Sequence, residues 1–131
     1  MIHIDYPDFT DILSTNPKFT GCVIDEGDKA HYLNGKLHRE GGPAYECANG
    51  TKEWYLNGEC HRTDGPAIEY INGAKFWYLN GLQHREDGPA IECANGNKYW
   101  HLNGKSLTEE EYLITIRENK LRAFLRTVSI P

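Results

Sequence analysis

Residues 57–79 read NGECHRTDGPAIEYINGAKFWYL. The stretches before and after it, residues 34–56 and 80–102, have the same length of 23 residues and the same residue types at matched positions. The types shared by all three copies are Asn-Gly, His-Arg, Gly-Pro-Ala, Glu, a second Asn-Gly, Lys and Trp, in that order. Partial copies flank them at 27–33 and 103–105. Self-similarity at such a period indicates an array in which each unit buries apolar surface against its neighbours.

Each unit reads as two strands joined by tight turns. Asn-Gly is the strongest two-residue hairpin signal, because a type I′ turn needs positive φ at both central positions. Residues 52–56 and 67–71 have the β-branched and aromatic composition of strands. The Gly-Pro step begins a strand, where the missing N–H of proline disturbs a ladder least. The sequence therefore predicts a mainly β protein, an antiparallel meander of about eight short strands.

Strand alternation predicts what each face of the sheet carries. Trp54, Trp77 and Trp100 point to one face, and their recurrence at one position indicates a stack between repeats. The opposite face carries the candidate protein-binding residues, which are Tyr32, Tyr55, Phe76, Tyr78 and Tyr99. These aromatic side chains are either an exposed binding stripe or a surface that the termini cover. Whether the sheet is open or rolled stays undecided from the sequence.

The two ends of the chain break the repeat and are expected to cap it. From Thr108 onward the apolar residues recur with helical spacing. Either Ser106 with Glu109 or Thr108 with Glu111 could form a capping box, which predicts a helix over 109–126. The apolar stripe expected to cover the last strand comprises Tyr112, Leu113, Ile116, Leu121, Phe124, Leu125 and Val128. We therefore expect one domain over 1–131, with an N-terminal cap at 1–20, hairpin repeats at 21–105 and a C-terminal helical cap at 106–131.

Composition narrows the functional classes. The chain has 131 residues and a formal net charge of −5, which argues against binding of duplex nucleic acid. No apolar run approaches the roughly 20 residues of a membrane span, and residues 1–5 lack the features of a signal peptide. Cys47 and Cys93 occupy one repeat position, so they are expected about 19 Å apart and unbonded. We expect a cytoplasmic protein with reduced cysteines.

The repeat resembles the MORN family, whose units are β-hairpins of the same period. The resemblance rests on Asn34-Gly35-Lys36-Leu37-His38, Ala48-Asn49-Gly50 and Trp54, and it extends over residues 27–105. The family's Gly-x-Gly is replaced here by His-Arg-x-x-Gly-Pro-Ala, and its Tyr-x-Gly-x-Trp by Lys-x-Trp-Tyr-Leu. This variant is similar to repeat proteins of large phages and giant viruses that end in a helix like the one beginning near residues 103–111. The resemblance implies a virus-associated binding protein in the host cytoplasm.

The recurring His-Arg pairs are the main candidate for small-ligand binding. The residues are His38, Arg39, His61, Arg62, His84 and Arg85. Arginine suits phosphate, but pairs about 9–10 Å apart are too far from one another to share a metal ion. The other interpretation is that each pair braces its own turn, with the arginine meeting an acidic residue such as Asp64 or Asp87. A group that recurs with the repeat is expected to be structural.

The sequence predicts a non-catalytic protein-binding module. No nucleophile elbow, P-loop, zinc-protease helix or dinucleotide fingerprint is present, so neither an enzyme nor a cofactor is expected. The resemblance implies a viral protein that binds and modulates a host component, such as part of a defence system. The alternative is a binder that sequesters a nucleotide or another phosphate-bearing signal. The oligomeric state stays undecided.

Overall fold

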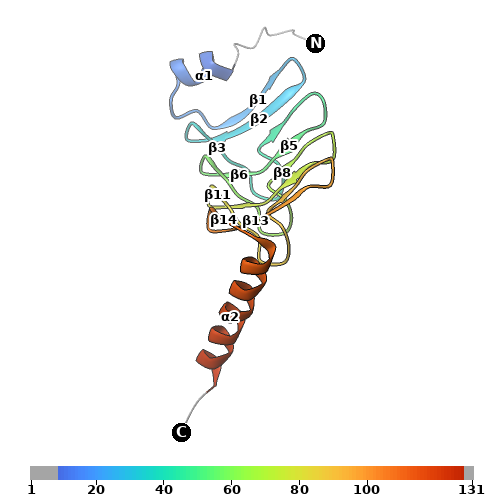
Figure 1. Ribbon diagram of the computed structural model, residues 1–131. Coiled ribbons are helices and arrows are strands. Elements are labelled where there is room, and N and C mark those ends of the chain that lie inside the picture. Colours follow the sequence, from blue (N-terminus) through green and yellow to red (C-terminus); the bar gives the residue numbers. More distant parts are fainter. Residues whose placement is uncertain (1–8, 129–131) are drawn as a thin grey trace.

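The computed structural model describes residues 9–128, with side chains from residue 12 onward. It is mainly antiparallel β-sheet followed by a C-terminal α-helix, which confirms the predicted fold class (Figure 1). The N-terminal cap predicted at 1–20 falls partly outside the described residues. Within them it contains a short helix, α1 (Phe9–Thr15).

One long sheet runs through the repeats, and its strands follow one another along the chain. Its order is β1-β2-β4-β5-β8-β9-β12-β13-β14, with β3 paired to β2. The bounds of these strands are β1 Gly21–Asp25, β2 Asp28–Leu33, β3 Lys36–Leu37, β4 Tyr45–Glu46, β5 Lys52–Glu53, β8 Ile68–Glu69, β9 Lys75–Phe76, β12 Ile91–Glu92, β13 Lys98–Leu102 and β14 Lys105–Leu107. The two smaller hairpins pair β6 (Tyr55–Leu56) with β7 (Glu59–Cys60), and β10 (Tyr78–Leu79) with β11 (Leu82–Gln83).

The strands are shorter and more numerous than the predicted eight, because Trp54 and Trp77 each interrupt a strand, whereas Trp100 lies within β13. Trp54 lies between β5 and β6. Its N–H donates to the Ala67 carbonyl oxygen at 2.7 Å, whereas its own carbonyl accepts from the N–H of His61 at 3.0 Å. The backbone at Trp54 therefore bonds to two different segments, and the chain bends there. Trp77 repeats this pattern with Ala90 and His84.

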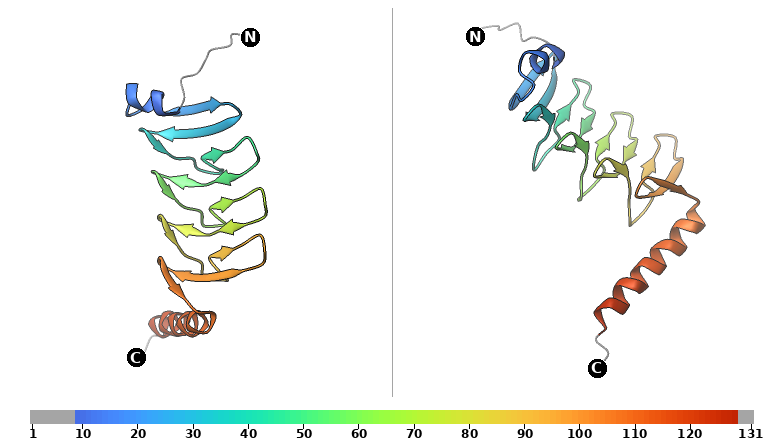
Figure 2. Two further views of the ribbon diagram at one scale, coloured as in Figure 1. Left: turned by 45° about the horizontal axis from the view of Figure 1, so that its top comes forward. Right: turned by 90° about the vertical axis from the view of Figure 1, so that its left-hand side faces the viewer.

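The stacked hairpins form an open staircase (Figure 2). The strand path begins at β1 and ends at β14, and these two strands do not pair with each other. The sheet is therefore open, which answers the question that the sequence left undecided. Its two ends carry different caps, α1 beside β1 and α2 (Glu109–Thr127) after β14 (Figure 2).

The two Asn-Gly steps of a unit form different turns. In the first, Asn57 has φ +51° and Gly58 has φ +81°, as a type I′ turn requires. The same pair of positive angles recurs at Asn34-Gly35, Asn80-Gly81 and Asn103-Gly104. In the second, only the glycine has positive φ, and the Asn49 side chain accepts a hydrogen bond from the Thr51 N–H at 2.9 Å. This asparagine serves as a side-chain acceptor within the turn.

The interior is thin and is built from small residues. Ala44, Ala67 and Ala90 occupy one repeat position, and each is 0 % exposed. Among the described residues, the largest fully buried side chain is that of Val23. Val23 belongs to a cluster at the N-terminal end with Ala30 and Tyr32, against which residues of α1 and Phe19 pack. Stability therefore comes from many contacts between neighbouring units.

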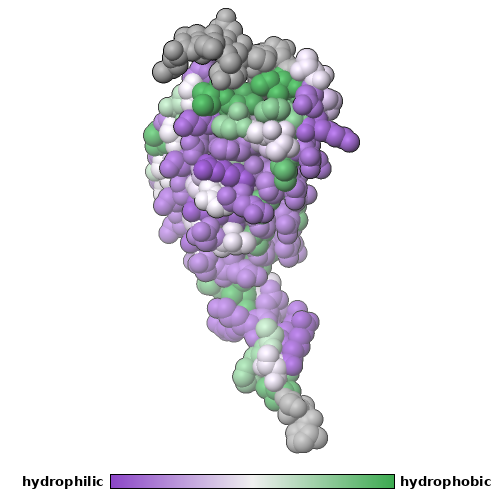
Figure 3. Space-filling view, turned by 180° about the vertical axis from the view of Figure 1, so that it is seen from behind, coloured by the Kyte–Doolittle hydropathy of each residue, from purple (hydrophilic) through white to green (hydrophobic). Residues whose placement is uncertain are grey.

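Helix α2 begins as predicted but does not cover the sheet. Thr108 is its N-cap, and its hydroxyl accepts a hydrogen bond from the Glu111 N–H at 3.1 Å. Of the helix residues, Tyr112 alone is buried. The expectation that the apolar stripe covers the last strand is wrong, because α2 projects away from the sheet after its first turn (Figure 2). The stripe residues more than half exposed are Leu113, Leu121, Phe124 and Leu125, and apolar side chains are visible along the helix (Figure 3).

Candidate functional site

Each histidine of the His-Arg pairs holds the turn of the following unit. Nδ1 of His61 accepts a hydrogen bond from the Asn80 N–H at 2.9 Å, at the start of the next type I′ turn. His38 and His84 make the same bond, at the same distance, to Asn57 and Asn103. The histidine therefore does not brace its own turn, as one interpretation of the sequence predicts. It bonds the backbone of a residue 19 positions further along the chain, in the turn of the next unit.

Each of the second and third arginines is held on all sides by groups of this chain. The Arg62 guanidinium lies over the Trp54 ring, with 3.9 Å from Cζ to the ring centroid. Its Nε donates to Asp64 at 2.9 Å, and its NH1 donates to the Pro66 carbonyl at 3.1 Å and to Glu69 at 3.2 Å. Arg85 repeats this arrangement over Trp77, with Asp87, Pro89 and Glu92. These contacts support the bracing interpretation, with cation–π attraction between units added to it.

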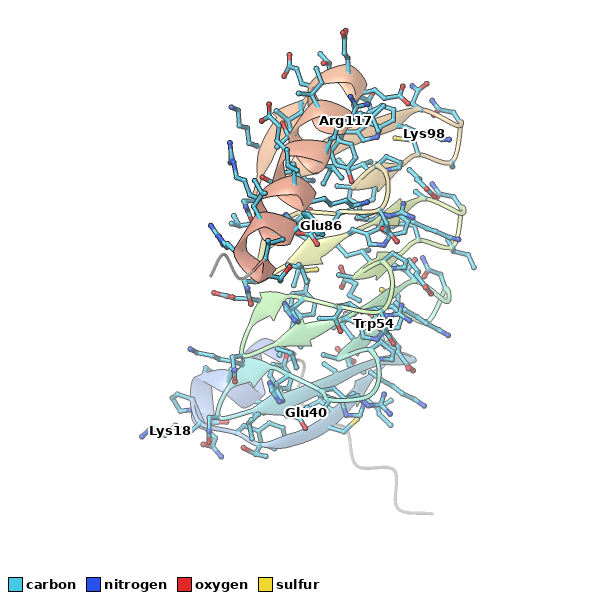
Figure 4. All side chains as sticks on the ribbon, turned by 90° about the horizontal axis from the view of Figure 1, so that it is seen from below. Lys18, Glu40, Trp54, Glu86, Lys98 and Arg117 are labelled. Atoms are coloured by element: carbon cyan, nitrogen blue, oxygen red, sulfur yellow. The ribbon has the colours of Figure 1, made fainter. Side chains whose placement is uncertain are left out.

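Polar clefts lie between successive His-Arg pairs. One, of about 570 Å³, lies between Arg62 and Arg85 and is lined by both, by Asp64, by Asp87 and by Trp77. The other, of about 620 Å³, lies between Arg39 and Arg62. A phosphate entering the first cleft would have to displace carboxylates that already neutralise both arginines. The contacts at this cleft therefore count against the nucleotide alternative. Figure 4 shows Glu40 and Glu86 on the loops at this side of the stack, with Trp54 between them.

The five predicted binding residues have different surroundings. Tyr32 is buried and packs edge-on against Phe19, with ring centroids 6.2 Å apart, so it belongs to the N-terminal core. For Tyr32, this placement fits the alternative in which a terminal segment covers the ring. Tyr55 and Tyr78 are half-buried, and the Tyr78 hydroxyl accepts a hydrogen bond from Gln83 at 3.2 Å. Phe76 is half-buried and Tyr99 is 48 % exposed.

Tyr70, which the sequence does not single out as a binding residue, completes this surface. It is exposed and lies edge-on to Phe76, with ring centroids 5.3 Å apart, and the next residue, Ile71, is 66 % exposed. A signal was present in the sequence: the other two units have Cys47-Ala48 and Cys93-Ala94 at these positions. We call the side chains of Tyr55, Tyr70, Phe76, Tyr78 and Tyr99 the aromatic face.

A shallow groove opens on the aromatic face. It has a volume of about 420 Å³ and is lined by Tyr70, Asn72, Ala74, Phe76, Cys93, Ala94 and Asn95. Because small residues stand opposite Tyr70 and Phe76, the groove leaves two aromatic rings accessible from one side. The lining of this groove is mainly apolar.

Burial changes the ionisation of groups beside the aromatic face. Burial, followed by the nearby Glu53 carboxylate, raises the pKa of Tyr55 to about 12. Burial also raises the pKa of Glu53 above its usual range. Burial first, and then the Glu53 carboxylate, raise the pKa of the Cys60 thiol to about 12. At neutral pH this patch therefore presents neutral phenol and thiol groups.

Cys60 should resist alkylation more than Cys22. With a pKa near 12, Cys60 is a thiolate in about one molecule in ten thousand at pH 8, and the thiolate is the reactive form. Cys22 is exposed. Iodoacetamide at pH 8 should modify Cys22 first and Cys60 at least about tenfold more slowly. Peptide mass spectrometry over time gives both rates, and the denatured chain is the control in which the difference should vanish. Equal rates in the folded protein would contradict the burial of Cys60.

Residues 9–128 contain neither a cluster of metal ligands nor a membrane-spanning helix. No three His, Cys, Asp or Glu side chains of this part gather closely enough to hold a metal ion. Neither of the described helices combines the length and the apolar character that crossing a bilayer requires. None of the four cysteines forms a disulfide bond.

The geometry defines a class: a β-hairpin repeat protein that pairs Arg62 and Arg85 with its own carboxylates on one face and carries accessible aromatic rings on the other. Comparison with known proteins found no matching family model, no matching curated protein and no matching solved structure.

Proposed function

We propose that this chain is a non-catalytic module that binds another protein through its aromatic face. The observation that carries the proposal is the groove in which Tyr70 and Phe76 meet, with Tyr99 exposed near it. Tyr99 and Phe76 both pair in register with Ile91, so their side chains lie on the same face of the sheet. Tyrosine provides a large, rigid contact area with a polar tip, and it is enriched among the residues that dominate binding energy.

The backbone supports this role because the groove lies on a rigid element. β8, β9 and β12 are consecutive strands of the long sheet, and each is tied to its neighbours by antiparallel pairing. A surface whose side chains are held in place loses little conformational entropy when a partner binds. An exposed aromatic surface beside the Glu53 carboxylate favours a protein partner over a nucleotide, whose phosphates a carboxylate would repel.

The resemblance supplies the proposed setting. A MORN-like repeat of the phage and giant-virus variant would act in the host cytoplasm on a host component, such as a part of a defence system. The partner is therefore proposed to be a host protein with an apolar contact surface.

The experiment compares two neighbouring residues on opposite faces of β13. Tyr99→Ala, combined with Tyr70→Ala, should weaken binding to a partner purified from the source host by about ten- to a hundredfold in calorimetry. Lys98→Ala is the matched control, because Lys98 is exposed on the same strand and, as the residue directly before Tyr99, lies on the other face of the sheet. Its affinity should equal that of the unmodified chain.

Two results would contradict the proposal. One is an unchanged affinity of the Tyr70→Ala, Tyr99→Ala protein for a partner that the unmodified chain binds directly. The other is the absence of direct binding by any purified co-eluting host protein.

A further inference from the structure

We infer that Arg39 is an open carboxylate-binding position, which an aspartate or glutamate side chain of the partner protein occupies. The inference rests on the proposed protein-binding function and names one chemical feature of the partner. Because Arg39 lies on the charged face of the first unit, the partner would have to contact that face in addition to the aromatic face. It comes from comparing the three His-Arg pairs of this chain, two of which contain the carboxylate that the first lacks.

The guanidinium of Arg39 is placed like those of Arg62 and Arg85. A Cβ built on Gly42 would lie 3.0 Å from Cζ of Arg39 and 3.2 Å from its Nε. The corresponding distances from Gly65 to Arg62 are 3.0 and 3.3 Å, and those from Gly88 to Arg85 are 2.9 and 3.1 Å. NH1 of Arg39 also donates to the Pro43 carbonyl at 3.2 Å, as the other two donate to theirs. The three guanidinium groups thus occupy one position in the repeat.

What differs is the set of partners around that position. Asp64 and Asp87 each accept from the arginine Nε at 2.9 Å, but the equivalent residue beside Arg39 is Gly41. Within the part of the chain that the structure describes, Nε of Arg39 has no hydrogen-bond acceptor. The nearest carboxylate, that of Glu46, lies 3.8 Å from NH1, against 3.2 and 3.0 Å for its equivalents.

The open position is accessible from solvent. The Arg39 side chain is 39 % exposed, compared with 20 % for Arg62 and 18 % for Arg85. The Asp64 side chain is 83 % exposed, so a carboxylate at this position comes from the solvent side. No heavy atom lies within 4 Å of a Cβ built on Gly41. A carboxylate from another molecule could therefore reach Nε of Arg39 along the path that Asp64 takes to Arg62.

The ring beneath the guanidinium also differs. His31 stands at the repeat position of Trp54 and Trp77. Burial first, and then the charges of Arg39 and Lys29, lower the pKa of His31 against an opposing effect of Glu46. His31 is therefore neutral at physiological pH, and Arg39 carries the local positive charge. Arg39 therefore lacks both the aspartate and the tryptophan ring that stabilise Arg62 and Arg85.

A carboxylate fits this position better than a phosphate. The two internal copies show one carboxylate oxygen at Nε, which is a single charge-assisted hydrogen bond. Glu40 and Glu46 lie near Arg39, and the chain has a net charge of −5, so a dianion would meet more repulsion than a monoanion. The cleft between Arg39 and Arg62 has Trp54 and Leu56 among its lining residues, which gives the rest of an acidic side chain an apolar wall.

The first test uses acetate as the probe and needs no partner. Acetate is titrated against the folded protein at constant ionic strength with sodium chloride, and the arginine Nε–Hε signals are followed by NMR. The Arg39 signal should shift and saturate, whereas the Arg62 and Arg85 signals should not move. An unmoved Arg39 signal would overturn the inference, as would saturation by inorganic phosphate at a lower concentration than by acetate.

Two reciprocal loop exchanges make this test specific. Glu40→Thr with Gly41→Asp gives residues 38–44 the same sequence as residues 61–67. Gly41 has φ +80° whereas Asp64 has no positive φ, so the exchanged loop is expected to adopt the backbone of the second unit, to supply an internal carboxylate and thereby to abolish the acetate response of Arg39. Thr63→Glu with Asp64→Gly copies the first loop into the second unit, and should make the Arg62 signal respond. If the acetate-induced shifts of the Arg39 and Arg62 signals were the same in the exchanged proteins as in the unmodified chain, the inference would be overturned.

The partner then separates this inference from the proposed function. The Glu40→Thr, Gly41→Asp protein should bind the purified partner about tenfold more weakly than the unmodified chain, with the aromatic face untouched. If the Glu40→Thr, Gly41→Asp protein bound the partner as tightly as the unmodified chain while the Tyr70→Ala, Tyr99→Ala protein bound it more weakly, the role of Arg39 would be overturned and the proposed function kept. If only the Glu40→Thr, Gly41→Asp protein bound more weakly, the role of the aromatic face would be overturned and Arg39 would be kept as a contact.

Discussion

Gly35→Ala should destabilise the N-terminal end of the protein by about 2–5 kcal/mol. Gly35 has φ +79°, where an added Cβ costs about 1–2 kcal/mol. The added Cβ would also overlap the carbonyl oxygen of Pro17, a backbone atom that cannot move aside alone. Overpacking of this kind costs about 1–3 kcal/mol more. Urea denaturation followed by tryptophan fluorescence and circular dichroism measures the loss.

The control for this prediction is Gly81→Ala in the third unit. Gly81 has φ +80°, but its Cβ would lie 3.7 Å from the nearest atom, in the Glu59 side chain. It should therefore cost only the backbone term, about 1–2 kcal/mol. The Gly35 turn also receives the segment after α1, since the Gly35 N–H donates to the Phe19 carbonyl at 2.8 Å. If both variants lost the same stability, Pro17 would not contact this turn as described.

Tyr112→Ala should detach α2 from the sheet and cost about 3–5 kcal/mol, the range for removing a buried aromatic side chain. Tyr112 is 3 % exposed. Its hydroxyl donates to the Arg85 carbonyl at 2.7 Å and accepts from the Gly88 N–H at 3.2 Å. Tyr112→Phe keeps the ring and should cost about 1–3 kcal/mol, because two inward-facing backbone groups lose their partner. Hydrogen exchange of the last unit and the helix, with urea denaturation, measures both effects.

Phe124→Ala is the matched control on the same helix. Phe124 is 62 % exposed, so its removal should change the free energy of unfolding by less than about 0.5 kcal/mol. A loss comparable to that of Tyr112→Ala would mean that the distal part of α2 packs on something in solution.

Most of the fold could be predicted from the sequence because each unit contains Asn-Gly steps, which mark its turns. Asn57-Gly58 needs positive φ twice, and the structure has it at every copy of that step. The second Asn-Gly looked identical in sequence but forms a turn in which the asparagine side chain is the acceptor. Strand length was overestimated because composition cannot show that the backbone groups of Trp54 bond to two different segments.

The surfaces were harder to predict, because they depend on which segments meet in space. The period of 3.6 in residues 109–126 identified a helix and its cap at Thr108, but periodicity does not say what covers an apolar stripe. Tyr32 has the same repeat position as Tyr55, yet Phe19 and α1 bury it. The histidine bond to the next unit was also missed, since a residue 19 positions away gives no local signal.

The open staircase has a consequence for how such a chain can change over time. Every unit is held by bonds to the units before and after it, such as the bond from the Trp54 N–H to Ala67, and no strand closes the sheet into a ring. Duplication or loss of one 23-residue segment would leave every remaining junction of the same kind. The length of the array can therefore grow or shrink by whole units without a new kind of contact between units. Departures such as Gly41 and His31 then mark units that have diverged from their copies.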